Sequence, residues 1–123
     1  GLRAARATLL PLGAAFAALP AATRASYENS ASFYSVGWSH GKEQLDGKPD
    51  VAKGSYYANP LHDAPFGASC AAEAARFPSY SQPNLWPTQE LPAFEPAFKA
   101  LGRLVVDVGL LVAAQCDAHV VRE

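Results

Sequence analysis

The sequence contains no methionine, only two cysteines and few charged residues. The absence of methionine from all 123 residues indicates a chain that was processed or that is part of a longer protein. Cys70 and Cys116 are too few for a disulfide scaffold, so we expect a reducing, cytoplasmic compartment. Ten basic residues against eleven acidic ones leave a net charge of −1, which argues against nucleic acid as a partner.

Long hydrophobic runs are also missing. The most apolar stretch, residues 104–114, contains Asp107 and falls well short of the ~20 residues that cross a bilayer, so we expect no membrane span. Half of the residues are hydrophobic, but much of that share is alanine, which adds little area to a core. The sequence therefore predicts a thin core.

The start of the chain allows two interpretations. Residues 1–27 carry Arg3, Arg6 and Arg24 with no acidic residue, which is typical of an organellar transit peptide. The same stretch also fits a folded helix, because Leu9 and Phe16 fall near one face at helical spacing. An organellar compartment therefore stays open as an alternative.

Helical structure is predicted over residues 4–27, with two interruptions. Pro11 lacks an N–H and clashes with the preceding turn, so the first helix is expected either to begin near Pro11 or to kink there. Pro20 is expected to end that helix and to open a second, short one.

Residues 28–90 are predicted to be mostly irregular, because Ser, Gly, Asn and Pro recur through them. One strand is predicted at residues 32–38, carrying Phe33, Tyr34 and Val36. Loops of this length usually need something else to pack against. Six aromatic residues of this part are expected either to cap the core, which we favour, or to line a groove: Tyr56, Tyr57, Phe66, Phe77, Tyr80 and Trp86.

A long amphipathic helix is predicted over residues 92–121, starting at Pro92 or as late as Glu95. Its apolar residues fall at alternating steps of four and three and form one stripe. Further apolar side chains widen this surface beyond what a thin core can cover. We therefore expect an exposed face that meets a partner, formed by Leu101, Val105, Val108 and Val112 and flanked by Leu104, Leu111 and Val120.

No residue pattern predicts a metal or catalytic site. His40, His62 and His119 show no metal-ligand spacing, and His62 and Asp63 are neighbours that point apart on an extended segment. Cys116 and His119 share a helix face, but zinc needs more ligands than these two provide. The remaining candidates are equally unpromising: Ser39 and His40 form no triad pattern, and no phosphate-binding glycine motif is present.

Four segments, in order along the chain, carry a resemblance to a known family. Residues 10–20 (LPLGAAFAALP) look like an F-F-x-L-P segment in which Ala17 replaces the second aromatic residue. Residues 33–50 carry a glycine-aromatic turn followed by E-x-L and K-P-D elements. Residues 53–60 (KGSYYANP) and 83–87 (PNLWP) complete the series, and the long helix follows. The chain thus resembles the N-terminal region of non-haem iron(II), 2-oxoglutarate-dependent oxygenases of the isopenicillin N synthase-like group, in their plant and algal form.

The resemblance implies a catalytic domain that these residues do not contain. In that family an H-x-D pair and a distal histidine hold Fe(II), and an arginine of an R-x-S motif grips 2-oxoglutarate. All of them lie on a jelly roll that follows the long helix. The chain contains neither motif. We therefore carry over no catalytic, cofactor-binding or metal-binding residue, and expect Fe(II) and 2-oxoglutarate only in a full-length parent.

The expected fold is α+β, mostly helical and irregular, without a jelly-roll core. Residues 1–123 are expected to form one N-terminal domain. Two functions remain. The first is a fragment of a 2-oxoglutarate and Fe(II)-dependent oxygenase of a small organic substrate, inactive alone, whose long helix packs on the missing jelly roll. The second is a stand-alone interaction module that docks the same helix face on a partner protein.

Overall fold

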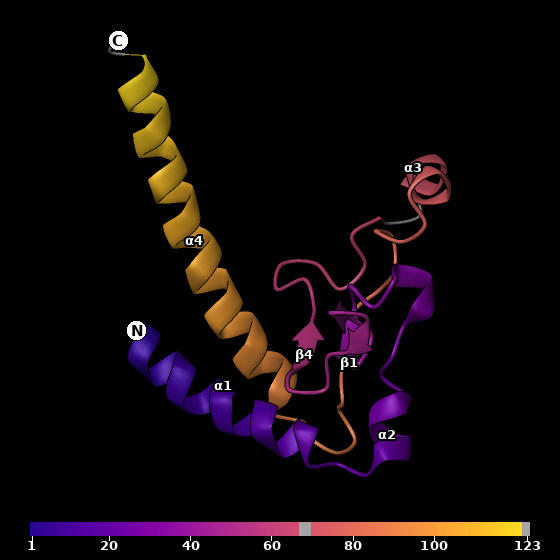
Figure 1. The fold of residues 1–123 in the computed structure, drawn as a ribbon. Coiled ribbons are helices and arrows are strands. Elements are labelled where there is room, and N and C mark those ends of the chain that lie inside the picture. Colours follow the sequence, from indigo (N-terminus) through magenta and orange to yellow (C-terminus); the bar gives the residue numbers. More distant parts are fainter. Residues whose placement is uncertain (67–69, 122–123) are drawn as a thin grey trace.

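The computed structural model describes residues 1–66 and 70–121 and combines helices with two small antiparallel sheets. The strands among these residues form no closed barrel, so the predicted α+β class without a jelly roll is confirmed. Figure 1 shows the longest helix, α4, on one side and the small helix α3 on the other, above a shared base. The elements in chain order are α1 (Leu2–Ala17), α2 (Ala21–Ala25), the 3₁₀ turn η1 (Ser30–Ser32), β1 (Gly37–His40), β2 (Gln44–Leu45), β3 (Lys48–Pro49), β4 (Gly54–Tyr57), α3 (Ala71–Arg76) and α4 (Phe94–Val120).

The first helix runs through Pro11 instead of beginning there. It starts at Leu2, so the expectation of a start near Pro11 is wrong. The hydrogen bond that Pro11 cannot donate is offset by packing, because Leu9 and Phe16 of the same helix face the core. Pro20 does separate the two helices, as predicted, and directly precedes α2.

The strand predicted at residues 32–38 is displaced toward the C-terminus. Asn29 caps η1 by accepting a hydrogen bond from the Ser32 N–H at 3.1 Å. Phe33 and Tyr34 follow with φ of 51° and 60°, in the left-handed region, which a strand cannot accommodate. Extended structure therefore begins only at Gly37.

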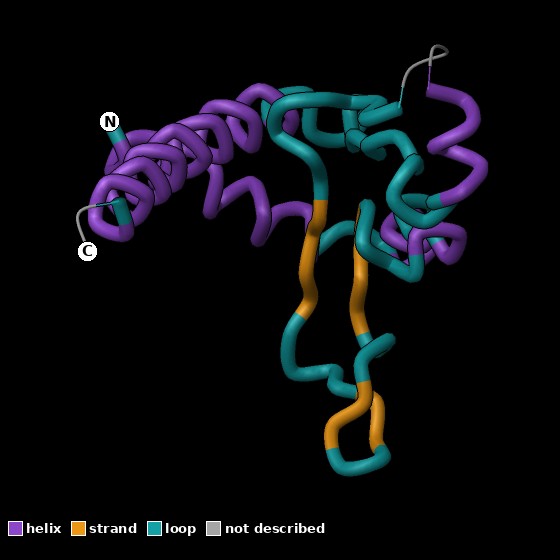
Figure 2. The backbone as a smooth tube through the Cα atoms, turned by 90° about the horizontal axis from the view of Figure 1, so that it is seen from above, coloured by secondary structure: helices purple, strands orange, loops and turns teal. Residues whose placement is uncertain are grey.

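Residues 28–90 contain more regular structure than expected. Strand β1 pairs antiparallel with β4, with Trp38 opposite Tyr56. The pair β2/β3 continues the same arm, turning at Asp46 and Gly47, which both have positive φ as a tight hairpin turn requires. Figure 2 shows this arm projecting away from the helices.

The core is small, as the alanine-rich composition predicts, and it is built of aromatic rings. Phe16, Trp38 and Phe94 form its buried cluster, and Tyr56 packs against it. The ring of Phe16 lies 5.3 Å from that of Trp38 and 4.8 Å from that of Tyr56, measured between centroids. Side chains from α1, β1, β4 and α4 thus meet in one cluster, which holds these four elements together.

Helix α4 begins at Phe94 and ends at Val120, so the predicted long helix is confirmed within two residues at either end. Pro96 lies in the first turn, where no N–H is needed for an intrahelical bond. Phe94 and Ala97 are buried, and α1 packs along the first half of the helix. The second half extends beyond the core (Figure 1).

Candidate functional site

Ser39 and His40 do not form a catalytic pair. Both lie on β1, where adjacent side chains point to opposite faces of the sheet. Ser39 is buried, and the His40 ring stacks on Trp38 with its Nε2 atom 3.1 Å from the Val51 carbonyl oxygen. The imidazole is thus held as part of the arm.

The other histidines and the cysteines are distributed over distant elements. His62 is exposed in a loop, Cys116 is exposed on the last turns of α4 with His119, and Cys70 directly precedes α3 on the opposite side of the molecule. Within residues 1–66 and 70–121, no group of three or more His, Cys, Asp or Glu side chains is placed to hold a metal ion.

Asp63 has a structural role that the sequence did not reveal. Its carboxylate accepts hydrogen bonds from Trp86 Nε1 at 2.7 Å, Asn84 Nδ2 at 3.0 Å and Lys99 Nζ at 2.6 Å. Lys99 also pairs with Glu95 at 2.5 Å. These donors, Lys99 above all, lower the pKa of Asp63 to about 2. The cluster fastens two loops to the first turns of α4.

The six loop aromatics divide between core and surface. Tyr56 and Trp86 pack against the core, as favoured, and burial raises the pKa of Tyr56, whose hydroxyl donates to the Leu85 carbonyl. Phe66 is half-buried. Phe77, Tyr80 and, at the margin, Tyr57 are exposed, so core packing is wrong for these three.

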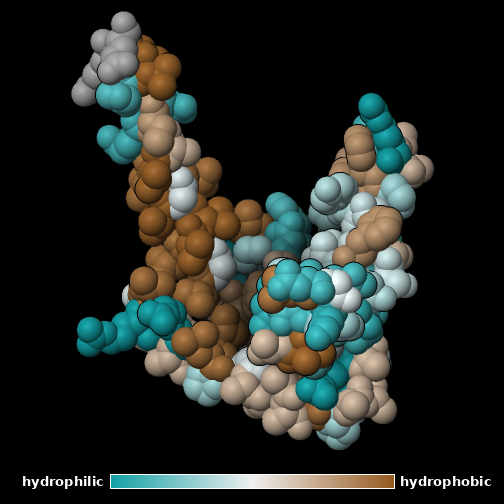
Figure 3. Space-filling view, in the orientation of Figure 1, coloured by the Kyte–Doolittle hydropathy of each residue, from teal (hydrophilic) through white to brown (hydrophobic). Residues whose placement is uncertain are grey.

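An exposed apolar surface runs along α4 from Val105 onward. Figure 3 shows it as a continuous brown band along that helix. We define the docking face as four residues that are all more than half exposed: Val105 at 57%, Val108 at 52%, Leu111 at 68% and Val112 at 58%. Helical spacing places them within one sector of the helix.

Two details of the predicted face need correction. Leu101 and Leu104 are half-buried, because α1 runs beside this part of α4. Leu2 of α1 lines a cavity of about 210 Å³ together with Leu104, Val105 and Val108. The exposed face therefore starts about one turn later than the sequence indicated.

The opposite sector of α4 mixes polar and apolar residues. It carries Arg103, Asp107 and Asp117, all exposed, together with Ala114 and with Leu110, which is 64% exposed. In the described residues, none of the helices has the length and apolar character needed to span a bilayer. The docking face nevertheless gathers four exposed apolar side chains in one sector, which is the pattern of a protein-binding surface.

Comparison of the chain with protein-family models, with curated proteins and with solved structures finds no match. The site is therefore defined by its geometry: a helix fixed at one end by an aromatic core and an Asp63 cluster, with an uncovered apolar face at the other end.

Proposed function

We propose that this chain is the region of a 2-oxoglutarate and Fe(II)-dependent oxygenase that packs against the catalytic jelly roll. The observation that carries the proposal is the docking face. Fully burying a Val or Leu side chain stabilises a complex by about 1.5–3 kcal/mol relative to exposure, so four such residues left in water favour association. The ordered resemblance of residues 10–60 and 83–87 to the isopenicillin N synthase-like group supports a jelly roll as the partner.

The direction of the helix fits this role. The core and the Asp63 cluster fix α4 at its start, and the docking face lies on the half that extends beyond them. A rigid helix presents its side chains in a fixed geometry, so little conformational entropy is lost when they become covered. The chain itself supplies positioning and no chemistry. Fe(II) and 2-oxoglutarate belong to the partner domain, and the cytoplasm is the compartment of this proposal.

The transcript tests the proposal directly. We expect the reading frame to continue past Glu123 into a segment with an H-x-D pair, a distal histidine and an R-x-S motif. A stop codon at that point would contradict it and would favour the alternative, a stand-alone module that docks the same face on another protein.

A turnover assay tests the assignment of chemistry to the partner. With Fe(II), ascorbate and 2-oxoglutarate, the purified chain is expected to release no CO₂ from 2-oxoglutarate above the iron-only background. Release that depends on the chain and follows its folded fraction would show that the chain has a catalytic site of its own.

A further inference from the structure

An exposed surface on the first turns of α1 adjoins the docking face. Leu2 of α1 lines the cavity of about 210 Å³ whose other walls are Leu104, Val105 and Val108 of α4. The same Leu2 side chain borders an open depression of about 530 Å³ on α1, which is walled further by Arg3, Arg6, Ala7, Leu10 and Pro11. A partner that covers Val105 and Val108 therefore reaches Leu2, and the two arginines lie directly beyond it.

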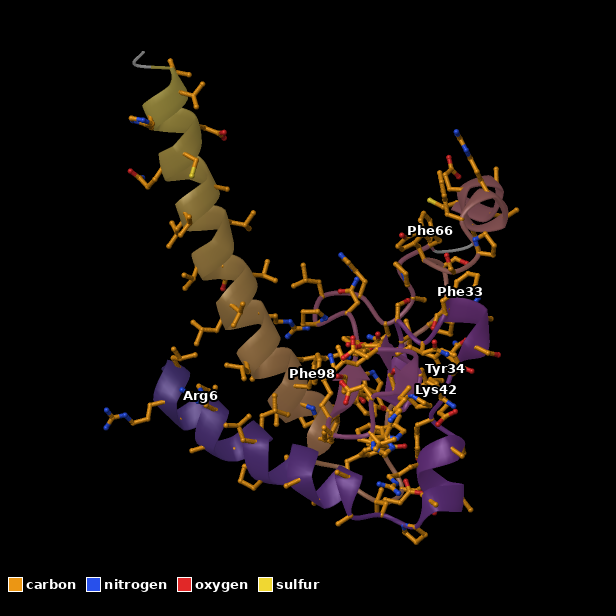
Figure 4. The ribbon with its side chains drawn as sticks, in the orientation of Figure 1. Arg6, Phe33, Tyr34, Lys42, Phe66 and Phe98 are labelled. Carbon is orange, nitrogen blue, oxygen red and sulfur yellow. The ribbon has the colours of Figure 1, made fainter. Side chains whose placement is uncertain are left out.

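Arg3 and Arg6 form a pair of like charges on this surface. They are three residues apart on one helix and both are exposed, so their side chains are neighbours on one face. Figure 4 shows Arg6 on the same side of the molecule as the half of α4 that extends beyond the core. Within the described residues the ion pairs are all made by lysines, and neither arginine takes part in one.

The chain places no carboxylate against these arginines in the part that the structure describes. Residues 1–27 contain no acidic residue at all. Glu28, the first one in the sequence, is paired with Lys42 at 2.7 Å. Asp107 projects from a different sector of α4 than Val105 and Val108, which lie beside α1. The positive charge is therefore presented outward, to whatever covers this surface.

Exposed apolar side chains flank the two charges. Leu2 is 52% exposed and Leu10, one turn after Arg6, is 57% exposed. A guanidinium group pairs with a carboxylate in bidentate geometry, so a complementary surface carries carboxylates together with aliphatic groups. A basic occupant would face like charges, and an uncharged one would remove water from the guanidinium groups without offering a partner. Complementarity thus selects an occupant that is both acidic and apolar.

A protein fits this surface better than a lipid bilayer does. Recruitment to anionic membranes typically takes a cluster of about 4–8 Lys or Arg residues, whereas the depression is walled by only Arg3 and Arg6 among its charged residues. Leu2 also connects the arginines to a cavity that α4 walls, so one occupant meets both helices. Contact with two helices at once is the geometry of a protein interface.

We propose that the protein that covers the docking face also contacts α1, through carboxylate groups that pair with Arg3 and Arg6 and an aliphatic side chain that packs on Leu2. This inference rests on the proposed function for the identity of the partner. It adds selectivity for charge, which the uncharged docking face cannot provide, because matched charges discriminate between partners of similar apolar area.

Three short peptides with blocked termini test the charge preference of this surface. Their sequences are Glu-Leu-Leu-Glu, Gln-Leu-Leu-Gln and Lys-Leu-Leu-Lys. Each is titrated at pH 7 into the isolated ¹⁵N-labelled chain, at a concentration where the chain is monomeric. The acidic peptide is expected to shift the amides of Arg6, Ala7 and Leu10 in a saturable manner. The other two should bind at least threefold more weakly, and about 0.5 M NaCl should remove most of that difference.

Arg3→Gln combined with Arg6→Gln should weaken binding of the acidic peptide at least threefold. Both side chains are exposed, so the double variant does not endanger the fold. Arg103→Gln is the matched control, because Arg103 is an exposed arginine of α4 outside the docking face. It should leave the affinity for the acidic peptide within about 1.5-fold.

Three results would each overturn the inference: equal binding of the three peptides, equal weakening by Arg103→Gln, or no saturable shift on α1. Sedimentation with phosphatidylserine vesicles that requires Arg3 and Arg6, without saturable peptide binding, would assign the surface to lipid and would overturn it as well. None of these results bears on whether a jelly roll covers α4, so failure of this inference is distinguishable from failure of the proposed function.

Discussion

Phe16 is the residue on which the small core depends most. It is 1% exposed and contacts the rings of Tyr27, Trp38, Tyr56 and Phe94 at centroid distances of 4.8–6.1 Å. Phe33 provides the opposite case, since it is 82% exposed at a left-handed position, away from the core in Figure 4.

Phe16→Ala is expected to lower the free energy of unfolding by about 3–5 kcal/mol, because it removes a buried ring and leaves a cavity. The matched variant Phe33→Ala should change that free energy by less than about 0.5 kcal/mol. Urea titration followed by circular dichroism measures both. Similar losses in the two variants would contradict the placement of the core.

The Asp63 carboxylate makes the stability of the folded chain depend on pH under acidic conditions. Its pKa is about 2 in the folded chain against an ordinary 3.8, so protons bind more tightly to the unfolded state. The contribution of the carboxylate is therefore complete above about pH 4 and is lost as the pH falls toward 2. The side chain is 53% exposed, so solvent screens the contribution to about 1 kcal/mol or less.

Asp63→Asn should thus be less stable than the parent chain at pH 5.5, with the difference shrinking as the pH approaches 2. Urea unfolding of both proteins at pH 5.5 and near pH 2 measures the difference between their free energies of unfolding. A difference that is the same at both pH values would show that the Asp63 carboxylate is not charged in the way the cluster requires.

At the scale of elements, two glycines of α4 occupy different surroundings. Gly102 packs against Pro60, whereas a Cβ atom at Gly109 would have no atom within 4 Å. Gly102→Ala is expected to destabilise the chain by about 1–3 kcal/mol through overpacking. Gly109→Ala should stabilise it by up to about 1 kcal/mol through helix propensity. Thermal unfolding of the two variants shows whether each substitution raises or lowers stability. A change in the same direction for both would contradict the close approach of Gly102 to Pro60.

Helices were predictable from sequence where periodicity and prolines agree. The apolar stripe from Phe94 to Val112 predicted α4, and Pro20 predicted the boundary between α1 and α2. The strand was misplaced because aromatic and β-branched residues at 33–36 favour extension, while the Asn29 cap and its hydrogen bond to Ser32 impose a turn. Tertiary packing of Phe16 likewise overrode the local cost of Pro11.

The docking face was largely predictable, since Val105, Val108 and Val112 follow from spacing alone. That Leu101 is half-covered depends on the path of α1, which no local pattern encodes. The Asp63 cluster joins residues far apart in the chain. Its local signal was the Pro83–Pro87 run, whose asparagine is typical of turns.

At the scale of the whole molecule, an uncovered docking face favours self-association of the isolated chain. Sedimentation velocity over about a tenfold range of concentration is expected to show a rising average mass. Val108→Glu combined with Leu111→Glu should suppress the rise, and Ala114→Glu on the opposite sector should not. An average mass that stays at the monomer value over the whole concentration range would contradict the expectation that the docking face drives self-association.

Calorimetric binding of this chain to the jelly-roll segment that we propose as its partner tests the proposed function most directly. We predict saturable binding that Val108→Glu with Val112→Glu weakens at least tenfold, because an unpaired carboxylate would be buried, and that Ala114→Glu leaves within about twofold. Absence of binding, or equal weakening by Ala114→Glu, would contradict the assignment of α4 as the docking element.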